Sequence, residues 1–133
     1  LPSLIEAEVV HSLEEKLGEV IYVDFWASWC APCRLSMPVL EQLYSEFSAD
    51  GFTVYAVNVD EIREDALNFI EDIMVSYPLL ADPDGLIPEL YAIIGMPTGV
   101  LIDRKGVVSY LHVGYRSGDE VALREKITAE LTK

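Results

Sequence analysis

The two cysteines of this 133-residue chain, Cys30 and Cys33, are separated by only two residues. The segment before them, residues 21–25, is rich in β-branched and aromatic residues and predicts a strand. Residues 35–47 carry apolar side chains at helical spacing and predict a helix. The Cys-x-x-Cys pair therefore lies where a strand ends and a helix begins. Because a helix N-terminus favours a nearby anion, we expect the Cys30 thiolate to be a nucleophile at neutral pH.

Two other uses of a cysteine pair fit the sequence less well. A structural zinc site needs about four ligands, and His11 and His112 lie at no recognised spacing, so we expect no metal. A structural disulfide across so short a loop would stabilise the fold little. With 51% hydrophobic residues, the chain can also bury a core without such a staple. Redox chemistry is therefore favoured, with Cys30 as the attacking thiolate and Cys33 as the thiol that resolves the mixed disulfide.

There are two further alternatives to this dithiol chemistry, peroxidase activity and an inert scaffold. Peroxidase activity is the weaker of them, because the Pro-x-x-x-Thr-x-x-Cys pattern of peroxiredoxins is missing from the sequence. An inert scaffold with an accidental Cys-x-x-Cys stays open as an alternative. That scaffold would leave the presence of Trp29, Pro32 and Pro97 to be explained separately.

The composition indicates one acidic domain over residues 1–133. The chain has 23 acidic and 9 basic residues and a net charge of −14, which argues against binding to nucleic acid or to an anionic membrane surface. No run of residues is apolar and long enough to cross a bilayer. The chain begins at Leu1 rather than Met, so we expect a mature or trimmed form from which an export signal or anchor was removed.

The remaining elements follow from periodicity and turn residues. A capping-box pattern at residues 3–6, followed by apolar residues every four positions up to Leu17, predicts a first helix that Gly18 ends. Pro38 falls inside the helix after the cysteine pair and should kink it. The apolar segment 52–59 predicts a buried strand, parallel to the first because a helix joins them. The other expected elements are, in order, a helix at 62–73, a strand at 79–81, a turn at 82–85, a helix at 86–93, a hairpin of strands 99–102 and 107–113 with its turn at 103–106, and a last helix whose capping box begins at Ser117.

The cysteine pair in residues 23–34, VDFWASWCAPCR, is followed far downstream by the sequence Gly95-Met-Pro-Thr98. These segments resemble the active-site segment and the cis-proline loop of the thioredoxin superfamily. Residues 78–114 resemble the extracytoplasmic TlpA/ResA-like branch, in which an extra helix and short strand form an insertion before the cis-proline loop. The resemblance extends from about residue 19 onward. It implies a cis Met96–Pro97 bond, although X–Pro bonds in folded proteins are cis only about 5–6% of the time.

Asp24 lies on the first strand in an apolar setting, six residues before Cys30. Buried carboxylates are rare without a task, and burial raises their pKa toward neutrality. The resemblance implies that Asp24 exchanges protons with Cys33. The alternative is an Asp that faces outward at the end of the strand.

The resemblance also implies a groove for an extended, cysteine-containing peptide. Pro97 has no N–H to offer the dithiol, while the exposed backbone of Met96 could pair with such a peptide. Trp29 and Pro32, together with Ala31 and Met96, would give this groove an apolar rim. Met96 as a simple core residue is the alternative.

The sequence departs from the TlpA/ResA pattern at two positions. Many members of that branch have a glutamate three residues after the second cysteine, where this chain has Ser36, and a neutral residue where this chain has Asp24. This chain has its carboxyl group on the strand, at Asp24, and none at Ser36 on the helix. Ordinary thioredoxins also have the acidic residue on the strand. A narrow specificity for apocytochrome c therefore does not follow.

Together these observations predict an α/β thioredoxin fold with a central mixed sheet of four or five strands, helices on both faces and the TlpA-like insertion. The expected function is reduction of disulfides in protein substrates by Cys30 and Cys33, without a bound cofactor. The resemblance implies a monomer outside the cytoplasm, in the bacterial periplasm, that takes electrons from a membrane-embedded thiol reductase; a cytoplasmic location is the alternative. The rival function is a non-catalytic binding module that uses the Met96–Pro97 groove.

Overall fold

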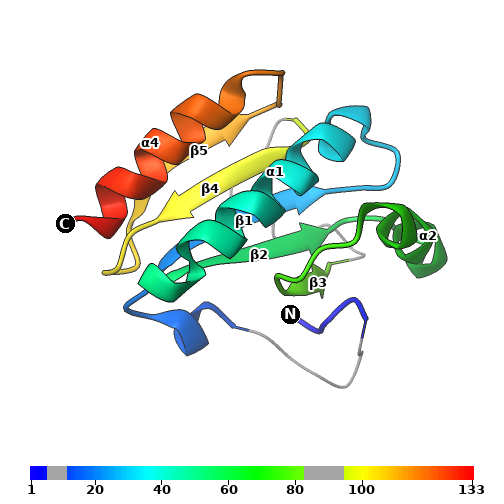
Figure 1. Cartoon of the computed structure of the whole chain (residues 1–133). Coiled ribbons are helices and arrows are strands. Elements are labelled where there is room, and N and C mark those ends of the chain that lie inside the picture. The colour runs from blue at the N-terminus through cyan, green and yellow to red at the C-terminus, as the bar shows by residue number, and fades with distance from the viewer. Residues whose placement is uncertain (6–11, 83–94) are drawn as a thin grey trace.

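The computed structural model describes residues 1–5, 12–82 and 95–133. In this part of the chain, five strands form one mixed sheet in the order β3-β2-β1-β4-β5 (Figure 1). The strands are β1 (Val20–Trp26), β2 (Phe52–Asn58), β3 (Leu79–Ala81), β4 (Thr98–Ile102) and β5 (Val108–Val113). The predicted mixed sheet is confirmed, and so is the short strand of the insertion.

The central strand is β1, which pairs in parallel with β2 and antiparallel with β4. Its parallel partner follows the intervening helix, as the βαβ pattern predicts. Asp24 near the end of β1 lies opposite Ala56 on one side and Gly99 on the other. Gly99 in turn lies opposite His112 on β5. Asp24, Gly99 and His112 therefore form one row across three strands.

The helices of the described part are α1 (Ala31–Phe47), α2 (Arg63–Ile73) and α4 (Asp119–Leu131), with short 3-10 turns at Leu13–Lys16 and Ser48–Asp50. Helix α1 begins directly after Cys30 and keeps Pro38 in its interior. Figure 1 shows α1 and α4 lying across the same face of the sheet. None of these helices combines the length and the apolar composition that a bilayer span requires. The helix predicted at 86–93 lies outside the described residues.

Alternate residues of β1 point to opposite faces of the sheet, as in any strand. Tyr22 and Trp26 join the core beneath the helices, which also contains Leu40 of α1 and Leu123 of α4. Val23 and Phe25, the residues that alternate with these, belong to a second cluster on the other face. Asp24 lies two residues from both Tyr22 and Trp26 and therefore projects from the same face of the sheet. Its carboxyl group points toward the helices and not toward solvent.

The N-terminal helix predicted to begin at Ser3 is wrong at that end. Ser3 forms an antiparallel bridge with Leu80 of β3, and the Leu4 N–H donates to a β3 carbonyl at 2.8 Å. Pairing with the sheet edge satisfies these backbone groups in an extended conformation, which a local capping pattern cannot foresee. Residues 6–11 lie outside the described part of the chain, and the described residues 13–16 form a 3-10 turn.

The capping box predicted at Ser117 is also wrong. The N-cap of α4 is Gly118, with φ of 97°, and it makes no side-chain capping bond. Asp119, the first helical residue, accepts a hydrogen bond from the Arg116 N–H at 2.9 Å. The carboxylate of Asp119 thus fixes the loop that leads into α4 instead of capping the first turn.

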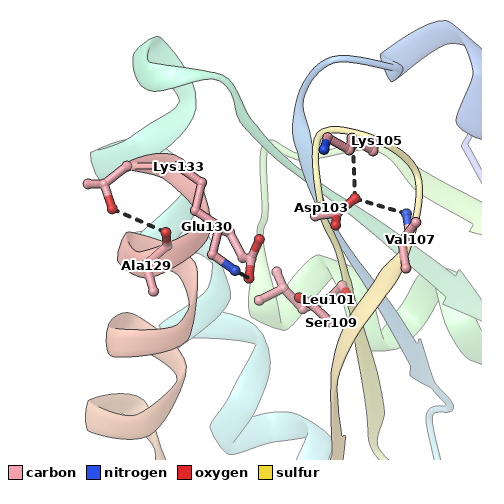
Figure 2. A network of polar contacts seen from close by, with 9 residues as sticks. Leu101, Asp103, Lys105, Val107, Ser109, Ala129, Glu130 and Lys133 are labelled. Atoms are coloured by element: carbon pink, nitrogen blue, oxygen red, sulfur yellow. Dashed lines mark hydrogen bonds and ion pairs between the residues drawn. The ribbon is translucent and has the colours of Figure 1, made fainter.

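The predicted hairpin between β4 and β5 turns at Asp103-Arg-Lys-Gly106, and Gly106 adopts a φ of 84°. Figure 2 shows the Asp103 carboxylate accepting the backbone N–H groups of Lys105 and Val107, each at 2.9 Å. These bonds lower the pKa of Asp103, chiefly the one from Val107. The turn fixes how β5, and with it His112, lies beside β4.

Candidate active site

Cys30 and Cys33 are joined by a disulfide, with their Cα atoms 5.4 Å apart. Cys30 is the N-cap of α1 in an extended conformation, and Pro32 lies in the first turn, where a missing N–H does no harm. The Cys33 N–H donates to the Cys30 carbonyl at 3.2 Å. Cys33 is completely buried, whereas Cys30 stands at the helix start, where the helix dipole favours a thiolate.

The loop that carries Cys30 is tied to the end of β2 by a buried carboxylate. Asp60 is 6% exposed and accepts the Ser28 N–H at 2.8 Å and the Ser28 hydroxyl at 2.7 Å. The Asn58 side-chain amide donates to the same carboxylate at 2.7 Å. The Cys30 N–H closes the turn by donating to the Ala27 carbonyl at 3.1 Å. The nucleophile thus begins α1 from a loop fixed at both ends.

Asp24 is buried, with 2% of its surface exposed. Loss of solvation raises the pKa of its carboxyl group to about 8. Within the described part of the chain, its Oδ2 atom has no hydrogen-bond partner. The expectation of an inward-facing Asp24 is therefore met, and a carboxyl group of this kind can exchange protons near neutral pH.

A cavity beside Asp24 has room for about one water molecule. Ser36 of α1, Pro97 and His112 line it together with Asp24. Ser36 and Asp24, the two positions at which this chain differs from the TlpA/ResA pattern, therefore line the same cavity. An acid on either element would occupy nearly the same place.

The Met96–Pro97 peptide bond is cis. Met96 is half-buried and packs against the core cluster that contains both cysteines as well as against the cluster on the other face. Trp29 is 68% exposed beside Cys30, and Pro32 is half-buried. These side chains give the surface around the dithiol an apolar character, although Met96 is also a core residue.

His112 and Asp60 are site residues that sequence reasoning missed. The sequence places His112 at no metal-ligand spacing, yet its Nε2 lies 3.1 Å from the Asp119 carboxylate and its Nδ1 lies 3.1 Å from the Tyr110 hydroxyl. Register and chain folding bring these groups together, so no local pattern signals them. For Asp60 the only signal was a polar Asn-x-Asp directly after a buried strand. His11 lies outside the described residues, and among those described no group of three or more metal-ligating side chains is assembled.

Comparison with known proteins agrees with this geometry. The Redoxin family matches residues 3–127. The chain belongs to the Redoxin family. Within it, the chain is 34% identical over 113 residues to the thioredoxin-like protein YneN of Bacillus subtilis, and 32% identical over 96 residues to the thiol-disulfide oxidoreductase ResA of Bacillus thuringiensis. These alignments cover 83% and 72% of this chain but only 65% and 56% of the relatives.

A solved structure carries the same fold. The chain superposes with a TM-score of 0.93 on a protein from Chlorobium tepidum assigned as the thiol:disulfide interchange protein DsbE. The two are 44% identical, and the match covers 98% of this chain and 91% of the other. The predicted thioredoxin fold is confirmed, and this redoxin carries its cysteine pair at the start of α1 within that fold.

Proposed function

We propose that this redoxin is a thiol-disulfide oxidoreductase that reduces disulfides in protein substrates through Cys30 and Cys33. The observation that carries the proposal is the disulfide between these residues at the first turn of α1. The names of the relatives, thiol-disulfide oxidoreductase and thiol:disulfide interchange protein, support it. We treat residues 1–133 as a single domain.

In the reduced protein, the Cys30 thiolate attacks one sulfur of the substrate disulfide, and the other substrate sulfur leaves as a thiolate. The Cys33 thiol then loses its proton and attacks the Cys30 sulfur of the mixed disulfide. The second substrate thiolate leaves, and the Cys30–Cys33 disulfide forms. The protein gives up two electrons, which a donor must restore before the next cycle. No metal or cofactor enters these steps.

Asp24 is the acceptor for the proton of Cys33. Because burial raises its pKa to about 8, its carboxylate is a stronger base than an ordinary aspartate and can take a proton from a thiol near neutral pH. On re-reduction of the disulfide, Asp24 returns a proton to Cys33. This assignment accounts for a carboxyl group kept in the core, where the loss of solvation raises its pKa.

Substrates are proteins with an accessible cysteine, bound in extended form along the Met96–Pro97 loop. The exposed Trp29 and the half-buried Pro32 and Met96 would contact the peptide around its cysteine. The net charge of −14 gives no reason to invoke nucleic acid. By likeness to the ResA relatives, we place the protein outside the cytoplasm, as a monomer re-reduced by a membrane-embedded thiol reductase.

Reduction of insulin disulfides tests the proposal. With dithiothreitol as electron source, the wild-type protein should accelerate insulin precipitation, and Cys30→Ser should abolish the acceleration. A wild-type protein that binds cysteine-containing peptides but leaves insulin oxidised would instead be a binding module that uses the Met96–Pro97 groove.

A further inference from the structure

Proton transfer from Cys33 to Asp24 leaves a proton in the interior that must reach solvent. Cys33 is fully buried and Asp24 is 2% exposed, so neither exchanges freely with bulk water. A protein substrate bound over Cys30 would cover the dithiol side of the site for as long as the mixed disulfide exists. A second route, on the other side of Asp24, would let Asp24 release this proton to solvent while the substrate is still bound.

The row Asp24–Gly99–His112 provides a space on that other side. Directly opposite residues on paired strands project from the same face of the sheet, so Asp24 and His112 both point beneath the helices. Gly99 between them has no side chain, and a Cβ atom built there would overlap the hydroxyl of Tyr22. The Tyr22 hydroxyl therefore lies over Gly99, between the carboxyl group and the imidazole.

The cavity beside Asp24 connects the same groups. Tyr22, Asp24, Gly99 and His112 all line it, and it has room for about one water molecule. A carboxyl oxygen that makes no hydrogen bond within the described residues borders this space. One water there could accept from or donate to both Asp24 and the Tyr22 hydroxyl.

His112 continues the path to the surface. Its Nε2 lies 3.1 Å from the Asp119 Oδ2, and its Nδ1 lies 3.1 Å from the Tyr110 hydroxyl. The His112 side chain is 13% exposed and that of Asp119 is 30% exposed. The imidazole borders the cavity, and Asp119 and Tyr110 engage both of its nitrogens, so a proton enters it at Nδ1 from the Tyr110 hydroxyl and leaves it at Nε2 toward Asp119. Tyr110 lies in one row with Tyr22, across Leu101.

We propose that Tyr22 and His112, with a water in the cavity between them, form a proton path that connects Asp24 to the surface at Asp119. The inference rests on the proposed dithiol function. In each turnover the proton that leaves the Cys33 sulfur binds to Asp24 and passes to the cavity water and the Tyr22 hydroxyl. It then enters His112 at Nδ1 through the Tyr110 hydroxyl, while a proton leaves Nε2 toward Asp119. Re-reduction runs the same path inward, and no electrons move along it. Tyr22 and His112 act through Asp24, not on the substrate.

The charges around this path are compatible with it. Burial, followed by the influence of Asp24, raises the pKa of Tyr22 well above 10, so its hydroxyl keeps the proton that a relay needs. Tyr110, Tyr115 and Asp119 also face Tyr22. Burial, followed by the influence of Asp24, also raises the pKa of Tyr77, which follows α2, so this hydroxyl too stays protonated. Asp119 is held ionised by bonds from the Arg116 N–H and from His112, which lower its pKa.

Two substitutions test the path. Tyr22→Phe removes the hydroxyl alone, and His112→Leu removes the imidazole at similar volume. Each should slow single-turnover oxidation by insulin, followed by tryptophan fluorescence, about tenfold, which is at the low end of the usual contribution of proton transfer. Oxidation by hydroxyethyl disulfide, a molecule too small to cover the dithiol, should be unchanged. In an Asp24→Asn background neither substitution should slow the reaction with insulin further.

Tyr55→Phe is the matched control, because it removes another buried tyrosine hydroxyl, one that contacts the Ser12 carbonyl at 3.1 Å, and it should leave both rates unchanged. The path would be overturned if either substitution slowed the reactions with both disulfides equally, or if it slowed the reaction with insulin equally in the Asp24→Asn background. It would also be overturned if neither substitution slowed the reaction with insulin. A wild-type protein that reacts with neither disulfide would instead overturn the proposed function.

Discussion

At the scale of single residues, the two sulfurs differ chiefly in their place on the helix, since Cys30 is 5% exposed and Cys33 is completely buried. Cys30 caps α1 and Cys33 lies one turn inside it, fully buried. Replacing Cys33 with Ser should therefore trap the mixed disulfide, because the attacking thiolate remains and the resolving thiol is gone. Nonreducing electrophoresis and mass spectrometry should detect the adduct with a cysteine-containing substrate.

The complementary substitution is the control. Cys30→Ser should give no adduct, since Cys33 is shielded from a protein substrate. Adducts that accumulate on Cys30→Ser and are absent from Cys33→Ser would reverse the two roles.

Asp24 links stability to pH. Its pKa is raised to about 8 in the folded protein, whereas an unfolded aspartate titrates near about 4. Between these pH values the folded protein binds more protons than the unfolded chain, so the free energy of unfolding falls as pH rises. Asp24→Asn carries no charge and should be more stable than the wild type by about 4 kcal/mol at pH 7, with slower turnover.

Thermal or urea unfolding of both proteins from about pH 4 to pH 9 checks this dependence. The stability difference should vanish near pH 4, grow up to about pH 8 and then stay constant. Glu125→Gln, on the exposed face of α4, should show no such trend. A difference that does not change with pH would mean that Asp24 ionises as freely when folded as when unfolded.

At the scale of elements, the loop between β1 and α1 depends on the loop after β2. Asp60 accepts bonds from the backbone and side chain of Ser28 and from Asn58. Asp60→Ala would leave these donors unpaired in a buried place, and it should destabilise the protein by about 2–3 kcal/mol. The reaction of Cys30 with iodoacetamide should also change, because the start of α1 is no longer fixed.

Glu125→Ala is the matched control for the loss of a carboxylate, and it should leave both the unfolding midpoint and the alkylation rate of Cys30 near wild type. Ser28→Ala removes the hydroxyl but keeps the backbone bond, so its effect should be smaller than that of Asp60→Ala. Equal stability of wild type and Asp60→Ala would show that the tie between the loops carries little energy.

The elements themselves were largely predictable because their signals are local and strong. The apolar run of β2 and the helical stripe of α2 predicted both segments within a residue or so of their bounds. Capping boxes at Ser3 and Ser117 failed, since a Ser-x-x-Glu pattern cannot register a nearby sheet edge or a glycine that adopts the N-cap instead. Local patterns therefore located elements better than they located helix ends.

The site was predictable to the extent that one strand and one turn define it. Cys30, Cys33 and Asp24 lie within a single segment whose pattern fixes which face each occupies. The ties from Ser28 to Asp60, 32 residues apart, and from His112 to Asp119 depend on how β1 lies beside β2 and how α4 follows β5. The periodicity of the sequence does not predict these contacts, because they result from the packing of whole elements against one another.

At the scale of the whole molecule, the charge distribution leads us to expect a reductase. Redox poise depends on how strongly the protein stabilises the Cys30 thiolate relative to the disulfide. Strong oxidants rely on charges and donors around that sulfur. Here the residues between the cysteines, Ala31 and Pro32, offer neither a charge nor a side-chain donor.

Arg34, the nearest cation in sequence, contacts side chains of α2. Its guanidinium lies 4.6 Å from the centre of the Phe69 ring and 4.0 Å from the Asp72 carboxylate. Both partners of this ion pair are more than half exposed, so solvent screens their effect on Cys30. Asp24, when ionised, disfavours a thiolate in the same core, and the net charge of −14 acts in the same sense.

These charges favour the thiol form of the cysteine pair over the thiolate, which lowers the potential of the couple. We therefore expect a reduction potential nearer the thioredoxin value of about −270 mV than the oxidant value of about −120 mV. Equilibration with dithiothreitol redox buffers, read by tryptophan fluorescence from Trp26 and Trp29, gives the value directly. Substituting Pro32 with His should raise it, because an imidazole between the cysteines would stabilise the Cys30 thiolate. A wild-type potential near the oxidant end would make this redoxin a disulfide donor, and the path from Asp24 to His112 would then carry the proton inward in the step with the substrate and outward on re-oxidation.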